Sequence, residues 1–414
     1  MFRSVFPVLS LLLGTLLLLT ASGMQSMIMP LRGQWEGFSL AELGLLGTGW
    51  ASGFVVGCIV IPQLIGRIGH IRSLAAFSAI GAVVALLSGL IVDPLPWVLM
   101  RCITGFTMAG SFMVFESWLN DRATNENRGT IFGLYLVVTY IGIMIGQMSV
   151  YKGSFLGSNM FVVTGILYCL ALLPTVLSSD DTPSPPEKVR LDIRGLWRNS
   201  PMAVVACFLI GVANGCFGTL GAVYGSRIGL SATMVGIMMS IAVVAGAVVQ
   251  IPIGRLSDTM DRRYVLAVTA AVGAVSGLLL VIIRPVDPWL ILPMIAFYGA
   301  MAYALYSVAV AHANDFAGPQ DFVKISGGLL LLYGVGTIVG PLLGAKMMEI
   351  AGPEGLFIVT TVAQASISIY ALVRMVQRAA IADNLKSVFR SILSERVLTA
   401  ETGQLDPRSD HSKD

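Results

Sequence analysis

Twelve long apolar stretches follow one another along the chain, with short polar connections between them. Each is close to the ~20 residues that an α-helix needs to cross the hydrocarbon core of a bilayer. With its connections, a chain of 414 residues has room for such spans and for little else. Charged residues make up 12% of the chain, whereas soluble domains carry about a quarter. The sequence therefore excludes an ordinary soluble enzyme and predicts an all-α integral membrane protein.

The stretches fall into two groups of six, separated by a polar segment with three prolines. We predict an N-terminal six-helix bundle at 1–177, a cytoplasmic linker at 178–199, a C-terminal six-helix bundle at 200–376, and a tail at 377–414. The tail is predicted to hold an amphipathic helix on the membrane surface before it becomes disordered. The spans are expected at 5–30, 40–65, 73–92, 95–117, 130–151, 159–177, 202–224, 231–252, 264–284, 288–312, 326–347 and 355–376.

The first stretch has a second interpretation, because Arg3, an apolar run and a small-residue segment near Ala21 also resemble a signal peptide. The apolar run continues to Leu31, and the internal repeat described next needs this helix. Both points favour a retained transmembrane helix.

An internal repeat relates the two groups of spans. Ser39 matches Ser231 at an offset of 192, and Asp121 matches Asp315 at an offset of 194. Six helices per copy is an even number, so both copies enter the membrane in the same direction. The sequence thus predicts 12 transmembrane helices in two parallel six-helix repeats.

The Lys and Arg residues lie mostly on one set of alternate connections. Of 26 in the chain, we place six elsewhere: Arg101 inside a span, and Arg32, Lys152, Arg227, Arg284 and Lys346 on the opposite side. By the positive-inside rule, the richer side is cytoplasmic and carries both termini.

Two matching connections carry the most specific motif. The connection after the eighth span reads Gly254-Arg-Leu-Ser-Asp-Thr-Met-Asp-Arg-Arg263 and closely resembles the signature loop of the major facilitator superfamily. Its counterpart after the second span keeps Arg67 and Gly69 but has Gly66 where that family usually has an aspartate. The resemblance implies a conformational latch at the cytoplasmic helix ends, formed by Arg67, Gly69, Gly254, Asp258, Arg262, Arg263, Asp121 and Asp315. The arginines could instead serve only to set the topology.

Further motifs support the resemblance, which covers the chain to about residue 376. Arg101-Cys-Ile-Thr-Gly105 looks like the fourth-helix motif of proton-coupled members, and Glu116-Ser-Trp-Leu-Asn-Asp121 looks like the YcaD-like branch. The fold of this superfamily implies secondary transport by alternating access, with a substrate site near the bilayer midplane between the halves.

Few charged or titratable groups lie within the predicted spans, and these are candidates for proton coupling: Arg101, Glu116 and His312. A buried arginine without a partner costs at least ~2.5 kcal/mol, so Arg101 needs a polar partner unless it reaches the outer interface. Glu116 either carries a proton in a dry environment or joins a surface charge network with Arg122 or Arg128. His312 either titrates or is a packing residue.

Two larger sets of residues complete the predicted sites. Small residues that allow close helix approach resemble the antiporter motif of the superfamily, although packing alone would also explain them: Gly133, Gly142, Gly146, Gly327, Gly336, Gly340 and Pro341. The family fold implies a central cavity on helices one, four, seven and ten, where we note Gln25, Met108, Phe112, Asn214, Phe217, Tyr298, Tyr303 and Tyr306. Each of these could also simply pack between helices.

The leading functional hypothesis is therefore a proton-coupled secondary transporter of a small organic molecule, in the bacterial inner membrane. We expect a monomer, with no cofactor, metal or nucleic acid. A lipid flippase or a transporter-like sensor would share the fold. A membrane-embedded enzyme is disfavoured, because three histidines in the whole chain are too few for a clustered catalytic site.

Overall fold

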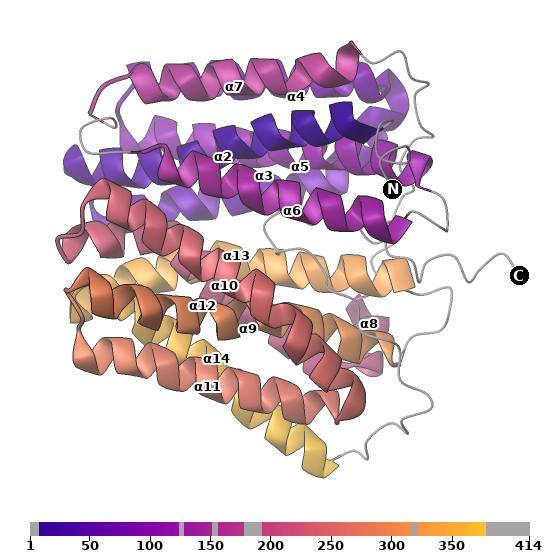
Figure 1. Cartoon of the computed structure of the whole chain (residues 1–414), viewed down its shortest axis with the longest axis vertical. Coiled ribbons are helices and arrows are strands. Elements are labelled where there is room, and N and C mark those ends of the chain that lie inside the picture. Colours follow the sequence, from indigo (N-terminus) through magenta and orange to yellow (C-terminus); the bar gives the residue numbers. More distant parts are fainter. Residues whose placement is uncertain (1–7, 124–127, 151–155, 178–192, 317–321, 378–414) are drawn as a thin grey trace, which may run out of the picture. The chain divides into compact units, whose positions relative to one another are not determined.

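The computed structural model describes residues 8–123, 128–150, 156–177, 193–316 and 322–377. Within these ranges the chain is helical and has no strand. The helices (Figure 1) are α2 (Leu9–Trp35), α3 (Leu40–Ile68), α4 (His70–Leu90), α5 (Pro94–Arg122), α6 (Arg128–Met148), α7 (Asn159–Val176), α8 (Ile193–Asn199), α9 (Pro201–Arg227), α10 (Ala232–Thr259), α11 (Arg262–Ile283), α12 (Pro288–Asn314), α13 (Phe322–Ala351) and α14 (Gly355–Gln377).

The predicted membrane-spanning fold is confirmed within the described residues, where 12 helices are long and apolar enough to cross a bilayer. Several helices run further than their apolar stretches. α5 continues to Arg122 and α10 to Thr259, because the polar residues that follow each apolar stretch continue the helix. The predicted linker contains the short helix α8. The predicted amphipathic helix of the tail lies outside the described residues.

Contacts divide the described residues into two compact units: 8–38 with 49–177, and 39–48 with 193–377. In the first unit, α2 packs against α6 and α7, and α4 packs against α5 and α7 (Figure 1). In the second unit, α9 packs against α13 and α14, and α11 packs against α12 and α14. The helices that pack together in the first unit thus correspond to those that pack together in the second. The domain boundaries stated above remain predictions.

The repeat also extends to the way its helices begin. Asp93 precedes α5 and accepts a hydrogen bond from the backbone N–H of Leu95 at 3.2 Å. Asp287 precedes α12 and accepts from the N–H of Trp289 at 3.0 Å. A proline follows each aspartate and occupies the first helical turn, where its missing N–H costs nothing.

Candidate functional sites in the two halves

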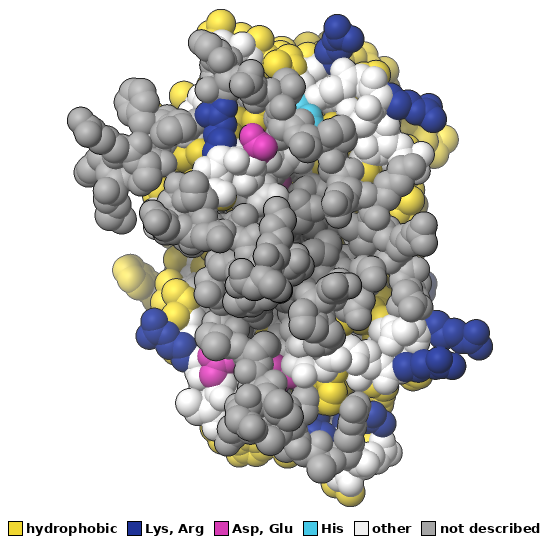
Figure 2. Space-filling view, turned by 90° about the vertical axis from the view of Figure 1, so that its right-hand side faces the viewer, with side chains coloured by type: hydrophobic (Ala, Val, Ile, Leu, Met, Phe, Trp, Pro, Cys, Tyr) yellow, Lys and Arg dark blue, Asp and Glu magenta, His cyan; other side chains and the backbone are white. Residues whose placement is uncertain are grey.

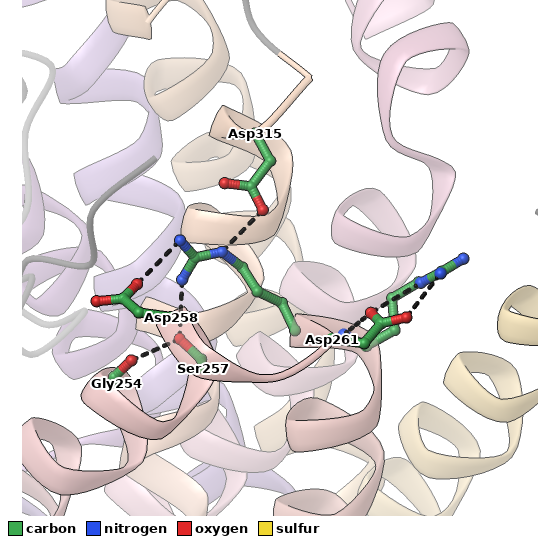
Figure 3. A network of polar contacts seen from close by, with 7 residues as sticks. Gly254, Ser257, Asp258, Asp261 and Asp315 are labelled. Atoms are coloured by element: carbon green, nitrogen blue, oxygen red, sulfur yellow. Dashed lines mark hydrogen bonds and ion pairs between the residues drawn. The ribbon is translucent and has the colours of Figure 1, made fainter. Parts of the chain in front are cut away.

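A buried arginine joins three helices at one end of the second unit (Figure 3). Arg262 is the first residue of α11 and its side chain is 1% exposed. Its Nε donates to Asp315 Oδ2 at 2.8 Å, and a terminal nitrogen lies 3.1 Å from Asp258 Oδ1. Another donates to Ser257 Oγ at 2.8 Å. Arg262 thus connects α10, α11 and the residue that ends α12.

The neighbouring pair fixes the start of α11. Asp261 caps the helix by accepting from the backbone N–H of Arg263 at 2.9 Å, and its carboxylate also pairs with the Arg263 guanidinium at 2.7 Å. Arg263 donates in turn to the carbonyl of Arg374 on α14 at 3.2 Å. Burial raises the pKa of Asp261, but the hydrogen bonds and charge of Arg263, with a contribution from His312, outweigh it and hold this pKa below its ordinary value.

The equivalent corner of the first unit is built differently. Gly69 lies between α3 and α4 with φ of 86°, a conformation that residues with a side chain rarely adopt. No side-chain hydrogen bond caps the start of α4. Arg67, predicted as part of the latch, is exposed at the end of α3.

Glu116 lies inside the first unit. Its side chain is fully buried, and the hydroxyl of Tyr135 on α6, also fully buried, donates to Glu116 Oε1 at 3.0 Å. Cys58 on α3 is within electrostatic range of this carboxyl group. Glu116 is thus not a surface residue, because α5 continues for six residues beyond it, to Arg122. Its role as a proton carrier or as a member of a charge network remains a prediction.

Arg101 occupies a separate place in the same unit. Its guanidinium carbon lies 5.9 Å from the centre of the Trp50 ring, which is close enough for a cation–π contact. Tyr168 on α7 is within electrostatic range of Arg101 and donates to Gln25 Oε1 on α2 at 3.0 Å. Arg101 therefore has the polar and aromatic surroundings that a membrane-embedded cation requires.

His312 belongs to the second unit, in the last turn of α12. It is 6% exposed, and its ring contacts Phe316 edge to face at a centroid distance of 5.2 Å. The role of Arg101, Glu116 and His312 in proton coupling remains a prediction.

The residues predicted for the central cavity are all buried. Within the second unit, Phe217 and Tyr298 pack with each other and with Phe357 of α14, with ring centroids 5.4–6.3 Å apart. Tyr306 contacts Tyr333 of α13 at 5.2 Å. These contacts are packing inside one unit, while a role in substrate binding remains a prediction for the whole set.

The glycine series marks equivalent close approaches in the two units. A β-carbon at Gly146 would collide with the carbonyl oxygen of Thr20 on α2, and one at Gly340 with that of Val212 on α9. Gly336 has a comparable contact with the carbonyl oxygen of Phe208, and Gly142 lies less tightly against Leu19 and Leu16. Gly133 has open space around it. Gly327 and Pro341 lie in α13.

Comparison with known proteins decides the family. The Major Facilitator Superfamily profile matches residues 11–305 and 204–400. The chain belongs to the major facilitator superfamily. It is 31% identical over 376 residues to an uncharacterized MFS-type transporter YcaD of Escherichia coli O6:K15:H31, covering 90% of this chain and 96% of that protein. The same transporter of Escherichia fergusonii is 28% identical over 375 residues, with the same coverage.

Solved structures of the superfamily share the fold. The nucleoside transporter NupG gives a TM-score of 0.72 at 16% identity, covering 89% of this chain and 98% of NupG. A bacterial homologue of the lysosomal transporter Spinster, in an inward-facing and occupied conformation, also gives 0.72 at 16% identity, covering 92% and 99%. The fucose:proton symporter FucP of E. coli gives 0.56 at 14% identity, covering 90% and 99%. This chain is thus a multi-pass membrane transporter and not an enzyme, which confirms the resemblance inferred from its motifs.

Several side chains at these sites were not predicted from the sequence. Four side chains each contact a predicted residue but were not among the predicted site residues: Tyr135, Tyr168, Trp50 and Ser257. Ser257 lies within the signature loop, so its place in the motif was a usable signal. The other three lie on different helices from their partners, and no spacing in the sequence links them.

Proposed function

We propose that this superfamily member is a proton-coupled secondary active transporter of a small organic molecule, working by alternating access, and that Glu116 is its proton-binding residue. The single observation that supports this most strongly is the buried hydrogen bond between Glu116 and Tyr135.

Burial disfavours the charged form of a carboxyl group, whereas a hydrogen-bond donor to the carboxylate favours it. The two protonation states of a fully buried carboxyl group therefore become close in free energy only when such a donor is present. Tyr135 supplies that donor, at 3.0 Å. Because α3, α5 and α6 all approach Glu116, a change in its charge acts on the packing of three helices. Intramembrane carboxyl groups with these properties commonly mark proton pathways.

The substrate is proposed to be a small organic molecule because the predicted cavity residues are aromatic, amide or thioether side chains rather than fixed charges. NupG is a nucleoside transporter and FucP a fucose:proton symporter. At 14–16% identity they share only the fold with this chain, but they show that it is compatible with small polar organic substrates and with proton coupling.

We further propose a bacterial inner-membrane location with both termini in the cytoplasm. The asymmetry of Lys and Arg over the connections supports this orientation. Lys and Arg side chains are visible on the molecular face drawn in Figure 2. The relatives from Escherichia support the bacterial location.

Transport in proteoliposomes tests the proposal. Compounds from a metabolite and drug panel that raise the thermal stability of the purified protein serve as substrates, and their flux is measured with and without an imposed pH gradient. We expect gradient-dependent flux in the wild type and at least ~10-fold less in Glu116→Gln, with binding retained. In Tyr135→Phe, loss of a hydrogen bond to a charged group, worth ~1.5–3 kcal/mol, should move the pH midpoint of transport upward by about one to two units.

Glu349→Gln is the matched control, because Glu349 is an exposed glutamate paired with Lys346. Its flux should equal that of the wild type. Flux that ignores the pH gradient would refute proton coupling, and full coupling in Glu116→Gln would remove this residue from the mechanism. Movement of fluorescent phospholipids between leaflets, without flux of any panel compound, would instead identify a flippase.

A further inference from the structure

The two units place different residues at the position that Arg262 occupies. At the repeat offset of 192, Arg262 corresponds to His70, and each is the first residue of its helix, α11 and α4. Asp315 corresponds to Asp121 at the offset of 194. The other two partners of Arg262, Asp258 and Ser257, correspond to Gly66 and Ile65, which have no side-chain acceptor. The first unit thus keeps one acidic residue and replaces the permanent cation with a histidine.

His70 is buried, and one of its ring nitrogens has no hydrogen-bond partner among the described residues. It is 2% exposed, and its Nε2 atom is buried without a hydrogen-bond partner among the residues that the structure describes. Its ring lies against Trp118 of α5, with a centroid distance of 5.7 Å. Trp118 is three residues before Asp121, whose charge acts on His70. An unpaired buried imidazole nitrogen is costly, and protonation gives this nitrogen an attraction to Asp121.

The described parts of the helices that pack against α4 carry few other charged groups. α4 packs against α5 and α7. Within its bounds α7 has no Asp, Glu, Lys, Arg or His, and its titratable side chains are Tyr168 and Cys169. α5 contributes Asp121, Arg122 and the buried Glu116.

Two arginines are nearer to His70 along the chain. Arg67 at the end of α3 and Arg72 in the first turn of α4 are both exposed to solvent, which screens their charge. Burial is the larger influence on the His70 proton and opposes it, whereas Asp121, which is itself exposed at the end of α5, favours it.

We propose that His70 and Asp121 form a proton-binding site that tightens the contact between the start of α4 and the end of α5 when a proton is bound. The equivalent contact in the second unit, Arg262 with Asp315, is always charged because arginine does not deprotonate in proteins. Histidine titrates near neutral pH, so one end of the first unit responds to pH while its counterpart does not. This site is separate from Glu116, and it stands or falls independently of the transport proposal.

Nuclear magnetic resonance of the full-length protein in nanodiscs, labelled with ¹³C at the histidine rings, tests this site directly. The chain has three histidines, and His70→Gln, His312→Gln and His411→Gln assign their signals. We expect the His70 signal to titrate, and its midpoint to fall by about 0.5–1 unit in Asp121→Asn. His312→Gln should leave that midpoint unchanged.

A second measurement links protonation to the helix contact. Hydrogen exchange of the first turns of α4, corrected for intrinsic rates, should slow as His70 takes up its proton. His70→Gln should remove this pH response, and so should Asp121→Asn. A His70 signal that does not titrate, a midpoint unchanged in Asp121→Asn, or exchange that stays pH-dependent in His70→Gln would each overturn the proposal.

Discussion

The ends of α3 and α4 in the first unit and of α10 and α11 in the second are equivalent by repeat, yet their chemistry differs. The second unit has a buried guanidinium with three side-chain partners, and an aspartate that caps the helix. The first unit has a glycine with positive φ at the aspartate position and a buried histidine at the arginine position. The shared fold therefore does not depend on the ionic network.

Features that both units share must then be those that the fold requires. The shared features are the helix pairs, the Asp-Pro starts of α5 and α12, and the glycines that bring α6 close to α2 and α13 close to α9. All of these act through backbone geometry. The features that differ are ionisable side chains at one end of each unit. At these positions the electrostatic contacts between helix ends can change while the helix packing stays the same.

The largest expected effect comes from removing the cation of the second unit. Arg262→Gln leaves Asp315, whose side chain is 3% exposed, as a buried charge without its partner, which costs about 3–5 kcal/mol. His70→Gln at the equivalent position should cost less than about 1 kcal/mol at neutral pH, because it removes no ion pair. Unfolding by sodium dodecyl sulfate in detergent micelles measures both.

Arg255→Gln provides the control, since Arg255 is an exposed arginine in the same loop motif. It should change stability by less than about 0.5 kcal/mol. Equal losses of stability in Arg262→Gln and His70→Gln would show that the second unit does not depend on its buried cation more than the first unit depends on His70.

Next in size is the glycine packing, which should affect both units alike. Gly146→Ala and Gly340→Ala each place a methyl group against a backbone carbonyl oxygen of the facing helix, and we expect a loss of about 1–3 kcal/mol from overpacking. Gly133→Ala, on the same helix as Gly146 but with open space around it, should be neutral or slightly stabilising. Thermal unfolding in detergent compares the stability of the three variants. If only one of Gly146→Ala and Gly340→Ala lost stability, close helix packing would matter in that unit alone.

Most of the fold could be predicted from the sequence, because a span needs a fixed number of apolar residues and the repeat fixes their grouping. The contacts of Arg262 in the second unit could be expected from the motif, since Asp258 is four residues before Arg262 and Asp315 has a repeat equivalent; the latch role itself remains a prediction. The extra length of α5 and α10 did not follow, because polar residues beyond the membrane can continue a helix when packing supports it.

The partners on other helices could not be predicted. Tyr135 reaches Glu116 across 19 residues of sequence, and the rotation of α5 and α6 that brings them together is set by packing in three dimensions. Phe217 and Tyr298 show the same limitation: their helices are apolar all round, so no periodic pattern marks which face meets Phe357.

The smallest expected effect concerns the cap that only the second unit has. Asp261→Asn keeps an oxygen that can cap α11 but removes the charge that pairs with Arg263. Because the pKa of Asp261 is held below its ordinary value, its charge adds stability at pH values above about 3.9, and this contribution is lost as the pH falls through the lowered pKa. The thermal stability of wild type and Asp261→Asn should therefore differ by a constant small amount from pH 7 to 5 and converge below about pH 4. A difference that persists in acid would show that the aspartate acts through its shape alone, and would leave the buried Arg262 network as the main electrostatic difference between the two units.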